Sequence, residues 1–316
     1  MPASSVRFED VNPDPVLTKF AVQYGAGGGF VMDSIAPVLN VQSRNYKYPR
    51  YAADQLDTDD KIEVAPGGRP NTTSFRLPSF VTGSVIRRAI DSAINRDGVE
   101  LADPSPLSSE ETHIAKIVHR IKIRIEKAGK ALLDAGSYSA SPSTKWDAGG
   151  NTIEKNIDDA KEAFEVRCGV PATHLIMPRA VANVVKRDSN IRALRKSTND
   201  NLLTNGELPF QIFGINVIIP GALENTANPG ASQSLARLWA TDTCYFVHVN
   251  PSISRDGSTL TTLAQMRWSA FDAPWLALRW QEPHRSQFVD WVSCGIYQNE
   301  ELVAPDALYL LTDCLT

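Results

Sequence analysis

Residues 108–134 read SSEETHIAKIVHRIKIRIEKAGKALLD, which has the spacing of one long amphipathic helix. Its apolar positions are three or four residues apart, so they share one stripe of the helix. The stripe comprises Ile114, Ile117, Val118, Ile121, Ile125, Ala128 and Leu132. Ser108 and Glu111 form a capping-box pattern at the start, and Gly136 is expected to end the helix in the left-handed conformation. At 1.5 Å per residue the helix spans about 40 Å, more than one small core requires.

The composition is that of an ordinary folded protein. The chain has 316 residues, of which 42% are hydrophobic and 22% charged, so one large domain or two linked lobes are both compatible with its length. The net charge of −4 does not indicate a chain that binds nucleic acid over its whole surface. The sequence has no apolar run of membrane-spanning length, and residues 1–9 lack the apolar core of a signal peptide. We therefore expect folding in a cytoplasm and no membrane partner.

Neither the cysteines nor the histidines are spaced as metal ligands. The cysteines are Cys168, Cys244, Cys294 and Cys314. No C-x-x-C pair occurs among them, so buried reduced thiols are favoured over a disulfide or a metal site. His113 and His119 share the long helix but are six residues apart, which puts them on different faces. We expect no metal, cofactor or catalytic site.

The first forty residues are predicted to form an extended arm. Pro13 and Pro15 disfavour a helix, and residues 25–29 (GAGGG) give the backbone unusual freedom. The glycine tract matches no phosphate-binding motif, because Phe30 stands where the dinucleotide fingerprint requires its third glycine. A hinge is therefore the favoured interpretation.

Residues 44–80 are predicted to form a long projecting hairpin. Tyrosines alternate with charged residues in an exposed outgoing strand, residues 61–64 (KIEV) continue it, and residues 73–77 (TSFRL) return. Residues 65–71 (APGGRPN) form the tip. An isolated two-stranded hairpin is only marginally stable in water, so we expect a neighbouring subunit to stabilise it. The candidate inter-subunit contacts are Tyr46, Tyr48, Arg50, Tyr51, Lys61, Arg69, Phe75 and Arg76.

A compact α/β lobe is predicted after the long helix. Helices are expected from Ile153 to a stop at Gly169 and over residues 181–191, with strands at 173–177, 213–219 and 235–249. Residues 260–316 contain four of the six tryptophans within alternating runs typical of long antiparallel strands. These tryptophans are expected in the core or at an interface rather than around a ligand.

This order of arm, hairpin, long helix, compact lobe and long strands resembles the major capsid proteins of tailed bacteriophages. Herpesvirus capsid floors and encapsulin nanocompartments share that fold. The segments that carry the likeness are residues 30–41, 46–75, 85–91, 106–127, 157–168, 173–178, 212–215 and 287–309. The resemblance implies an α+β fold in five parts. These are an N-terminal arm (1–43), an E-loop (44–80), a peripheral P domain (81–150) with the spine helix 108–134, an axial A domain (151–265) and a return to the P domain (266–316).

The resemblance also implies a structural protein rather than an enzyme. Copies would assemble as hexamers and pentamers into an icosahedral virion capsid around double-stranded DNA, each E-loop lying over a neighbour's P domain. Implied partners are a portal and a decoration protein. The scaffolding protein is expected to be a separate chain, because only about two dozen residues precede the glycine tract. The candidate inward-facing basic residues are Lys116, Arg120, Lys122, Arg124 and Lys127, with Lys130 beside them. A plain solvated face is the alternative for these side chains.

Two other functions stay open at this point. An encapsulin-like compartment would enclose a cargo enzyme in place of DNA. An α+β enzyme is the less favoured alternative, because the sequence lacks a nucleophile elbow, metal-ligand spacing and a phosphate loop. Some capsid proteins join a lysine to an asparagine covalently, and no local pattern supports that role for Lys61 and Asn299.

Overall fold

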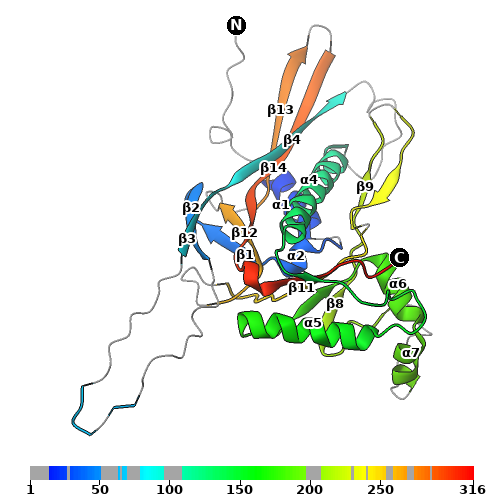
Figure 1. The fold of residues 1–316 in the computed structure, drawn as a ribbon. Helices are drawn as coiled ribbons and strands as arrows, with labels where there is room; N and C mark the ends of the chain where they lie inside the picture. Colours follow the sequence, from blue (N-terminus) through cyan, green and yellow to red (C-terminus); the bar gives the residue numbers. More distant parts are fainter. Residues whose placement is uncertain are drawn as a thin grey trace.

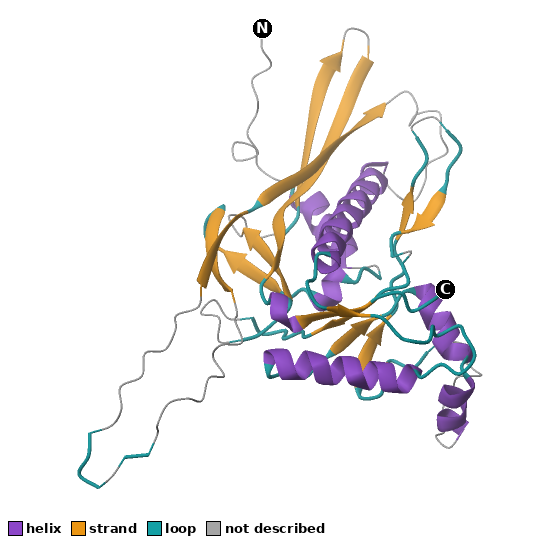
Figure 2. Ribbon diagram, viewed as in Figure 1, coloured by secondary structure: helices purple, strands orange, loops and turns teal. Residues whose placement is uncertain are grey.

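The described residues form two large β-sheets that meet at the long helix α4 (Ser109–Asp134), and two further sheets of two strands each (Figure 1). The computed structural model describes residues 14–26, 29–50, 63–64, 66–69, 79–95, 109–196, 208–228, 231–239, 241–253, 259–268, 274–284 and 287–316. Helices and strands alternate irregularly along the chain, which confirms the predicted α+β class. Figure 2 shows the sheet of long strands on one side of α4 and the sheet of shorter strands, with its helices, on the other.

The first sheet is arranged around β14, a strand of 16 residues. Strands β12 and β13 pair with successive parts of β14 along one edge, β4 pairs along the other edge, and β1 pairs with β12. All these pairs are antiparallel except β1 with β12, which is parallel. The strands are β1 (Val38–Val41), β4 (Ile86–Asn95), β12 (Leu263–Trp268), β13 (Leu276–His284) and β14 (Gln287–Leu302). The predicted long antiparallel strands near the C-terminus are therefore confirmed.

Helix α4 packs its apolar stripe against this sheet. Five of the seven predicted positions, Ile114 to Ile125, are at most 6% exposed, whereas Ala128 and Leu132 are half-buried and Leu133 is fully buried instead. The predicted reason for Gly136 is wrong, because its φ is not positive. A side chain there would meet Leu310 at 2.4 Å, so glycine is needed for close packing of the helix end on β15 (Leu308–Leu311). Ser108, the predicted cap, lies outside the described residues.

The second sheet has six strands in the order β5-β15-β11-β6-β8-β7. Helix α5 (Ile153–Cys168) covers it and ends at Gly169, which adopts the predicted left-handed conformation with φ 71°. Its strands are β5 (Ser139–Ala140), β6 (His174–Ile176), β7 (Gln211–Ile212), β8 (Ile215–Ile218), β11 (Cys244–Val247) and β15. Strand β15 joins this sheet, so the C-terminal part predicted as a return to the P domain contributes strands to both sheets.

Three elements of this lobe differ from the prediction. The helix expected over 181–191 is two helices, α6 (Arg179–Arg187) and α7 (Ser189–Lys196), because Asp188 is extended and its carboxylate caps α7. The strand expected over 213–219 begins with a turn, in which Phe213 and Gly214 both have positive φ. The strand expected over 235–249 is divided between β11 and β10 (Leu235–Arg237), which pairs separately with β9 (Leu223–Asn225).

The N-terminal arm contains a helix that the sequence argument did not predict. Helix α1 (Pro15–Ala26) begins at a proline because the first helical position needs no backbone N–H. Asp14 caps it by accepting hydrogen bonds from the N–H groups of Val16 and Leu17. The expectation that Pro15 disfavours a helix was therefore wrong. A second short helix, α2 (Met32–Ile35), follows the glycine tract.

The cysteines and tryptophans are mostly core residues. All four cysteines are buried and free of disulfides, as predicted, and burial raises the pKa of Cys294 to about 12. Trp275 is 5% exposed, but Trp280 is 37% exposed and stacks on Trp291.

In the described parts of the chain, no helix has the length and apolar character to span a membrane.

Candidate interface for assembly

The base of the predicted projecting hairpin is a two-stranded sheet. Strand β2 (Asn45–Arg50) pairs with β3 (Ser79–Ser84), from Asn45 opposite Ser84 to Arg50 opposite Ser79. The predicted return strand at 73–77 lies outside the described residues, and β3 follows it in the chain. Figure 1 shows the described tip residues, 63–64 and 66–69, far from both sheets, and all six are exposed.

The eight candidate contact residues divide into three groups. Arg50 and Arg69 are exposed, so they remain candidates for contact with a neighbour. Tyr46 and Tyr48 are only 7% and 6% exposed, so the expectation of an exposed strand is wrong for these two side chains. The remaining four, Tyr51, Lys61, Phe75 and Arg76, lie outside the described residues.

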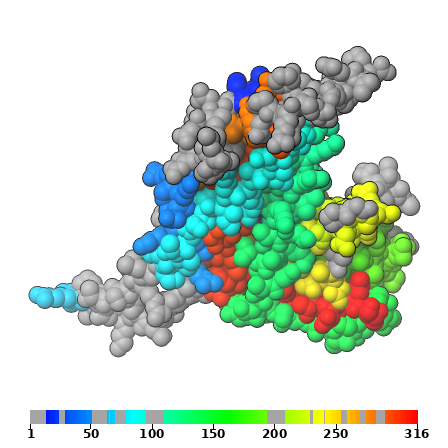
Figure 3. All heavy atoms as spheres, turned by 90° about the horizontal axis from the view of Figure 1, so that it is seen from above, coloured from blue at the N-terminus to red at the C-terminus, as the bar shows by residue number. Residues whose placement is uncertain are grey.

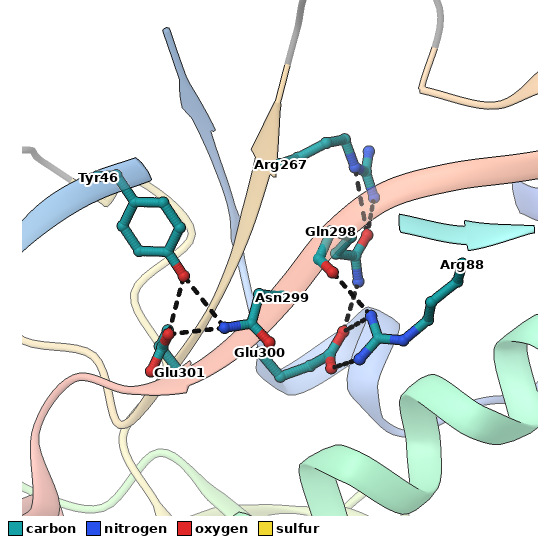
Figure 4. A network of polar contacts seen from close by, with 7 residues as sticks. All are labelled: Tyr46, Arg88, Arg267, Gln298, Asn299, Glu300 and Glu301. Carbon is teal, nitrogen blue, oxygen red and sulfur yellow. Dashed lines mark hydrogen bonds and ion pairs between the residues drawn. The ribbon is translucent and has the colours of Figure 1, made fainter. Parts of the chain in front are cut away.

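Tyr46 and Tyr48 are buried because they anchor the hairpin to the first sheet. Their hydroxyl groups donate to the two carboxylate oxygens of Glu301, at 2.8 and 3.1 Å respectively. Asn299 donates to the same carboxylate and to the hydroxyl of Tyr46 (Figure 4). Burial, reinforced by Glu301, raises the pKa of both tyrosines, so their hydroxyls stay protonated donors. The amide of Asn299 is thus engaged within its own subunit.

A second buried cluster lies beside the first on β14 (Figure 4). Arg88 on β4 binds both carboxylate oxygens of Glu300, at 3.0 and 2.6 Å, and Glu300 also accepts from Gln298. Arg267 on β12 donates to Gln298. Because a bidentate pair fixes direction as well as distance, this cluster holds three strands of the first sheet in register where the hairpin is attached.

The N-terminal segment is clamped to α4 by a buried carboxylate. Glu126, which is 0% exposed, accepts the backbone N–H groups of Val31 and Met32 at 3.0 Å each and the indole N–H of Trp239 at 2.8 Å. Burial raises the pKa of Glu126, against the opposing effect of these hydrogen bonds. Met32 packs closely against α4 at Gly129, because a side chain at Gly129 would lie 2.0 Å from the sulfur of Met32.

The basic residues of α4 separate into paired and unpaired sets. Lys122 is buried against Asp33 at 2.6 Å, so the expectation that it faces the shell interior is wrong. Lys127 pairs with Glu224, and Lys130 pairs with Asp134. The residues with no ionic partner in the described part of the chain are Lys116, Arg120 and Arg124, which we call the basic stripe.

The three residues of the basic stripe are exposed and four positions apart, which aligns them along one face of the helix. No described carboxylate lies within ion-pair distance of any of them. A shallow hollow lined by Lys116, His119 and Arg120 opens on the same face. Figure 3 shows that α4 reaches the surface between β4 and the yellow segment that holds β9 and β10. This face presents a row of positive charge without ionic partners among the residues that the structure describes.

Sequence reasoning did not identify the acidic residues that hold these sites together. Glu126 lay within the polar pattern of an amphipathic helix, and Glu300 and Glu301 lay at the end of an alternating strand. Of the three, only Glu126 could have been identified as buried from the sequence, because it falls between Ile125 and Gly129 on the packed side of the helix. The partners of all three are distant in sequence, so spacing alone does not reveal them.

Comparison with solved structures identifies the fold. The chain is similar to a phage-related protein from Bordetella bronchiseptica RB50, with 16% identity, 96% of this chain and 97% of that chain covered, and a TM-score of 0.68. It is similar to the capsid of cyanophage P-SCSP1u (8% identity, 88% and 86% covered, TM-score 0.58). It is also similar to the mature capsid of bacteriophage PhiM1 (12% identity, 88% and 85% covered, TM-score 0.57). No family model and no curated protein sequence matches the chain. The chain therefore has the phage capsid fold, as the sequence resemblance predicted.

Proposed function

We propose that the protein is the major capsid protein of a tailed bacteriophage, a structural subunit that assembles with copies of itself into an icosahedral shell around double-stranded DNA. The observation that carries this proposal is the extent of the fold match. It covers at least 85% of both chains in the comparisons with two solved phage capsids. The role is structural rather than catalytic.

The hairpin supports contact between copies. Its base is fixed by Glu301, while the described tip residues lie exposed and far from the sheets. An extension of this kind gains stability from a neighbouring subunit and enlarges the area buried per contact. We assign Arg50 and Arg69 to this contact, with hexamers and pentamers as the assembly units. The division into arm, E-loop, P domain and A domain is part of the same proposal.

The basic stripe supports a contact with packaged DNA. Its three cations have no described ionic partner and form one row on the exposed face of α4. Such a row suits the regularly spaced phosphates of a duplex without selecting a base sequence. We place this face toward the shell interior. As partners of the protein we propose a portal, a scaffolding protein and a decoration protein, and we propose that the shell assembles in the host cytoplasm.

Electron microscopy of the purified protein tests the proposal directly. We expect icosahedral particles that sediment at megadalton mass, and DNA protected from nuclease when the particles are isolated from infected cells. A chain that remains monomeric under all conditions of salt, pH and concentration would refute the shell. Particles that enclose one enzyme and no nucleic acid would instead identify an encapsulin-like compartment.

A further inference from the structure

Strand β13 is an edge strand of the first sheet within the described residues, because it pairs with β14 alone. Backbone groups alternate in direction along a strand, so every second residue presents its N–H and C=O away from β14. Ala277 is one of these outward residues, because its backbone groups bind α1 rather than β14. By the same alternation, positions 279, 281 and 283 also face outward. An edge of this kind is a template for pairing with another strand.

Helix α1 occupies the edge at Ala277. The N–H of Asp14 donates to the carbonyl oxygen of Ala277 at 3.0 Å, and the N–H of Ala277 donates to the hydroxyl oxygen of Thr18 at 3.2 Å. Both edge groups of Ala277 are thus satisfied by the N-terminal helix. Thr18 is 8% exposed, so water has little access to this contact.

Apolar packing holds α1 in this position. Leu17 and Ala21, 5% and 0% exposed, belong to the core that includes Ala277 and the stripe of α4. On the opposite side of the helix, Val16 is 69% exposed. Helix α1 is therefore a one-sided insert that covers the strand edge.

The attachment of α1 is separate from the clamp that follows it. The glycine tract lies between the two, and the clamp is held independently by Glu126 and by the Lys122–Asp33 ion pair. Loss of α1 would leave these contacts in place. The far end of β13 has its own protection, because Pro283 stands at an outward position and has no N–H to donate.

We propose that α1 is an edge cap, which keeps β13 from pairing with β13 of a second copy and so restricts contacts between copies to other surfaces. Two antiparallel β13 strands would present the same residues to each other, which makes the uncapped edge self-complementary. Pro283 blocks one end of this edge, and α1 blocks the other. The inference is independent of the proposed shell, because an exposed edge is a hazard for any soluble chain.

The first test compares the full chain with a variant that lacks residues 1–26, under dissociating conditions in which the full chain is a monomer. We expect the truncated chain to associate, with at least a doubling of its mass by light scattering. An excess of the peptide DPVLTKFAVQYGA (residues 14–26) should reverse the association, whereas the same peptide with Leu17→Asp and Thr18→Val should not. A truncated chain that stays monomeric, or two peptides that act equally, would overturn the proposal.

The second test uses the full chain and does not depend on folding of the truncated one. Thr18→Val removes the acceptor for the N–H of Ala277 while keeping the shape of the side chain. We expect amide hydrogen exchange at Ala277 to become at least tenfold faster. The control Thr312→Val removes a hydroxyl that donates to Ala140 and should leave Ala277 unchanged. An unchanged rate at Ala277 in Thr18→Val would contradict the edge contact.

Discussion

The hydroxyl of Tyr46 on β2 donates to Oε1 of Glu301, 2.8 Å away near the end of β14. Tyr48 donates to the other oxygen of the same carboxylate. Hydrogen bonds to an ionised acceptor are stronger than those between neutral groups. One carboxylate therefore fixes the direction in which the hairpin leaves the sheet.

Replacing Glu301 with glutamine should weaken this anchor. The amide of Glu301→Gln keeps one acceptor oxygen but places a donor opposite the second tyrosine hydroxyl. We expect the free energy of unfolding of the dissociated subunit, measured by urea denaturation, to fall by about 2 kcal/mol. The control Lys47→Ala changes an exposed residue on β2, between the two tyrosines, and should alter this free energy by less than about 0.5 kcal/mol. Equal effects of the two substitutions would show that the carboxylate is not an anchor.

Gly129→Ala tests whether packing outweighs helix propensity in α4. Alanine in the interior of a helix is normally favoured over glycine by about 1 kcal/mol. At this position the added carbon would lie 2.0 Å from the sulfur of Met32, so overpacking should give a net loss of about 1–3 kcal/mol. The double variant Gly129→Ala with Met32→Ala should lose less than the sum of the two single changes. A stabilised Gly129→Ala subunit in urea denaturation would contradict the close packing of α2 on α4.

The raised pKa of Glu126 predicts a specific pH dependence. Between the ordinary value of 4.5 and the raised value, the folded state holds a proton that the unfolded state has released. Stability contributed by this group is therefore complete below pH 4.5 and declines as the pH rises through the raised pKa. The unfolding free energy of the wild type, minus that of Glu126→Gln, should fall over this window in a urea series.

Trp239→Phe provides a second check on Glu126. It removes a donor that lowers the pKa of the carboxyl, so the decline should extend to higher pH. A difference that increases with pH would contradict the assignment of burial as the dominant influence.

Elements that depend on local signals could be predicted from the sequence. The periodicity of residues 108–134 predicted α4 to within one residue, and Gly169 predicted the end of α5 with its left-handed conformation. Proline was less informative, because Pro15 favours the first position of a helix and disfavours only later ones. Treating proline as a helix breaker at every position therefore missed α1.

Side-chain roles in the candidate interface were less predictable, because they depend on contacts between distant residues. Tyr46 and Glu301 are 255 positions apart, and nothing near either one indicates the other. On α4, Lys116 and Lys122 have the same local pattern, yet of the two only Lys122 has an ionic partner within the described ranges, Asp33 of the N-terminal segment. Charge spacing predicted a basic helix, and tertiary structure decided which charges remain available.

Removal of the basic stripe should weaken binding to duplex DNA. The triple variant Lys116→Ala, Arg120→Ala, Arg124→Ala removes three cations that have no described ionic partner. Each lost phosphate contact reduces the slope of log K against log salt by about 0.9, so the slope should become shallower by about 2 to 3. Fluorescence anisotropy of a labelled duplex with the dissociated subunit measures this change.

The matched control removes three positive charges elsewhere. Lys127→Ala and Lys130→Ala change cations that are paired with Glu224 and Asp134, and Arg187→Ala changes an exposed residue on α6. We expect little change in the slope. Similar slopes for both triple variants would mean that net charge, rather than the row on α4, governs binding.

Deletion of residues 59–71 separates folding from assembly. The described part of this segment is exposed and contributes no residue to the hydrophobic cores, so the subunit should keep its circular dichroism spectrum and its unfolding midpoint. If the tip contacts a neighbour, the deletion should prevent particles in electron microscopy and leave small oligomers in sedimentation. Arg69→Ala isolates one described tip residue, and Lys155→Ala, exposed on α5, is its control. Normal particles from the deletion would refute the hairpin contact while leaving the shell itself intact, because the remaining surfaces would then suffice for closure.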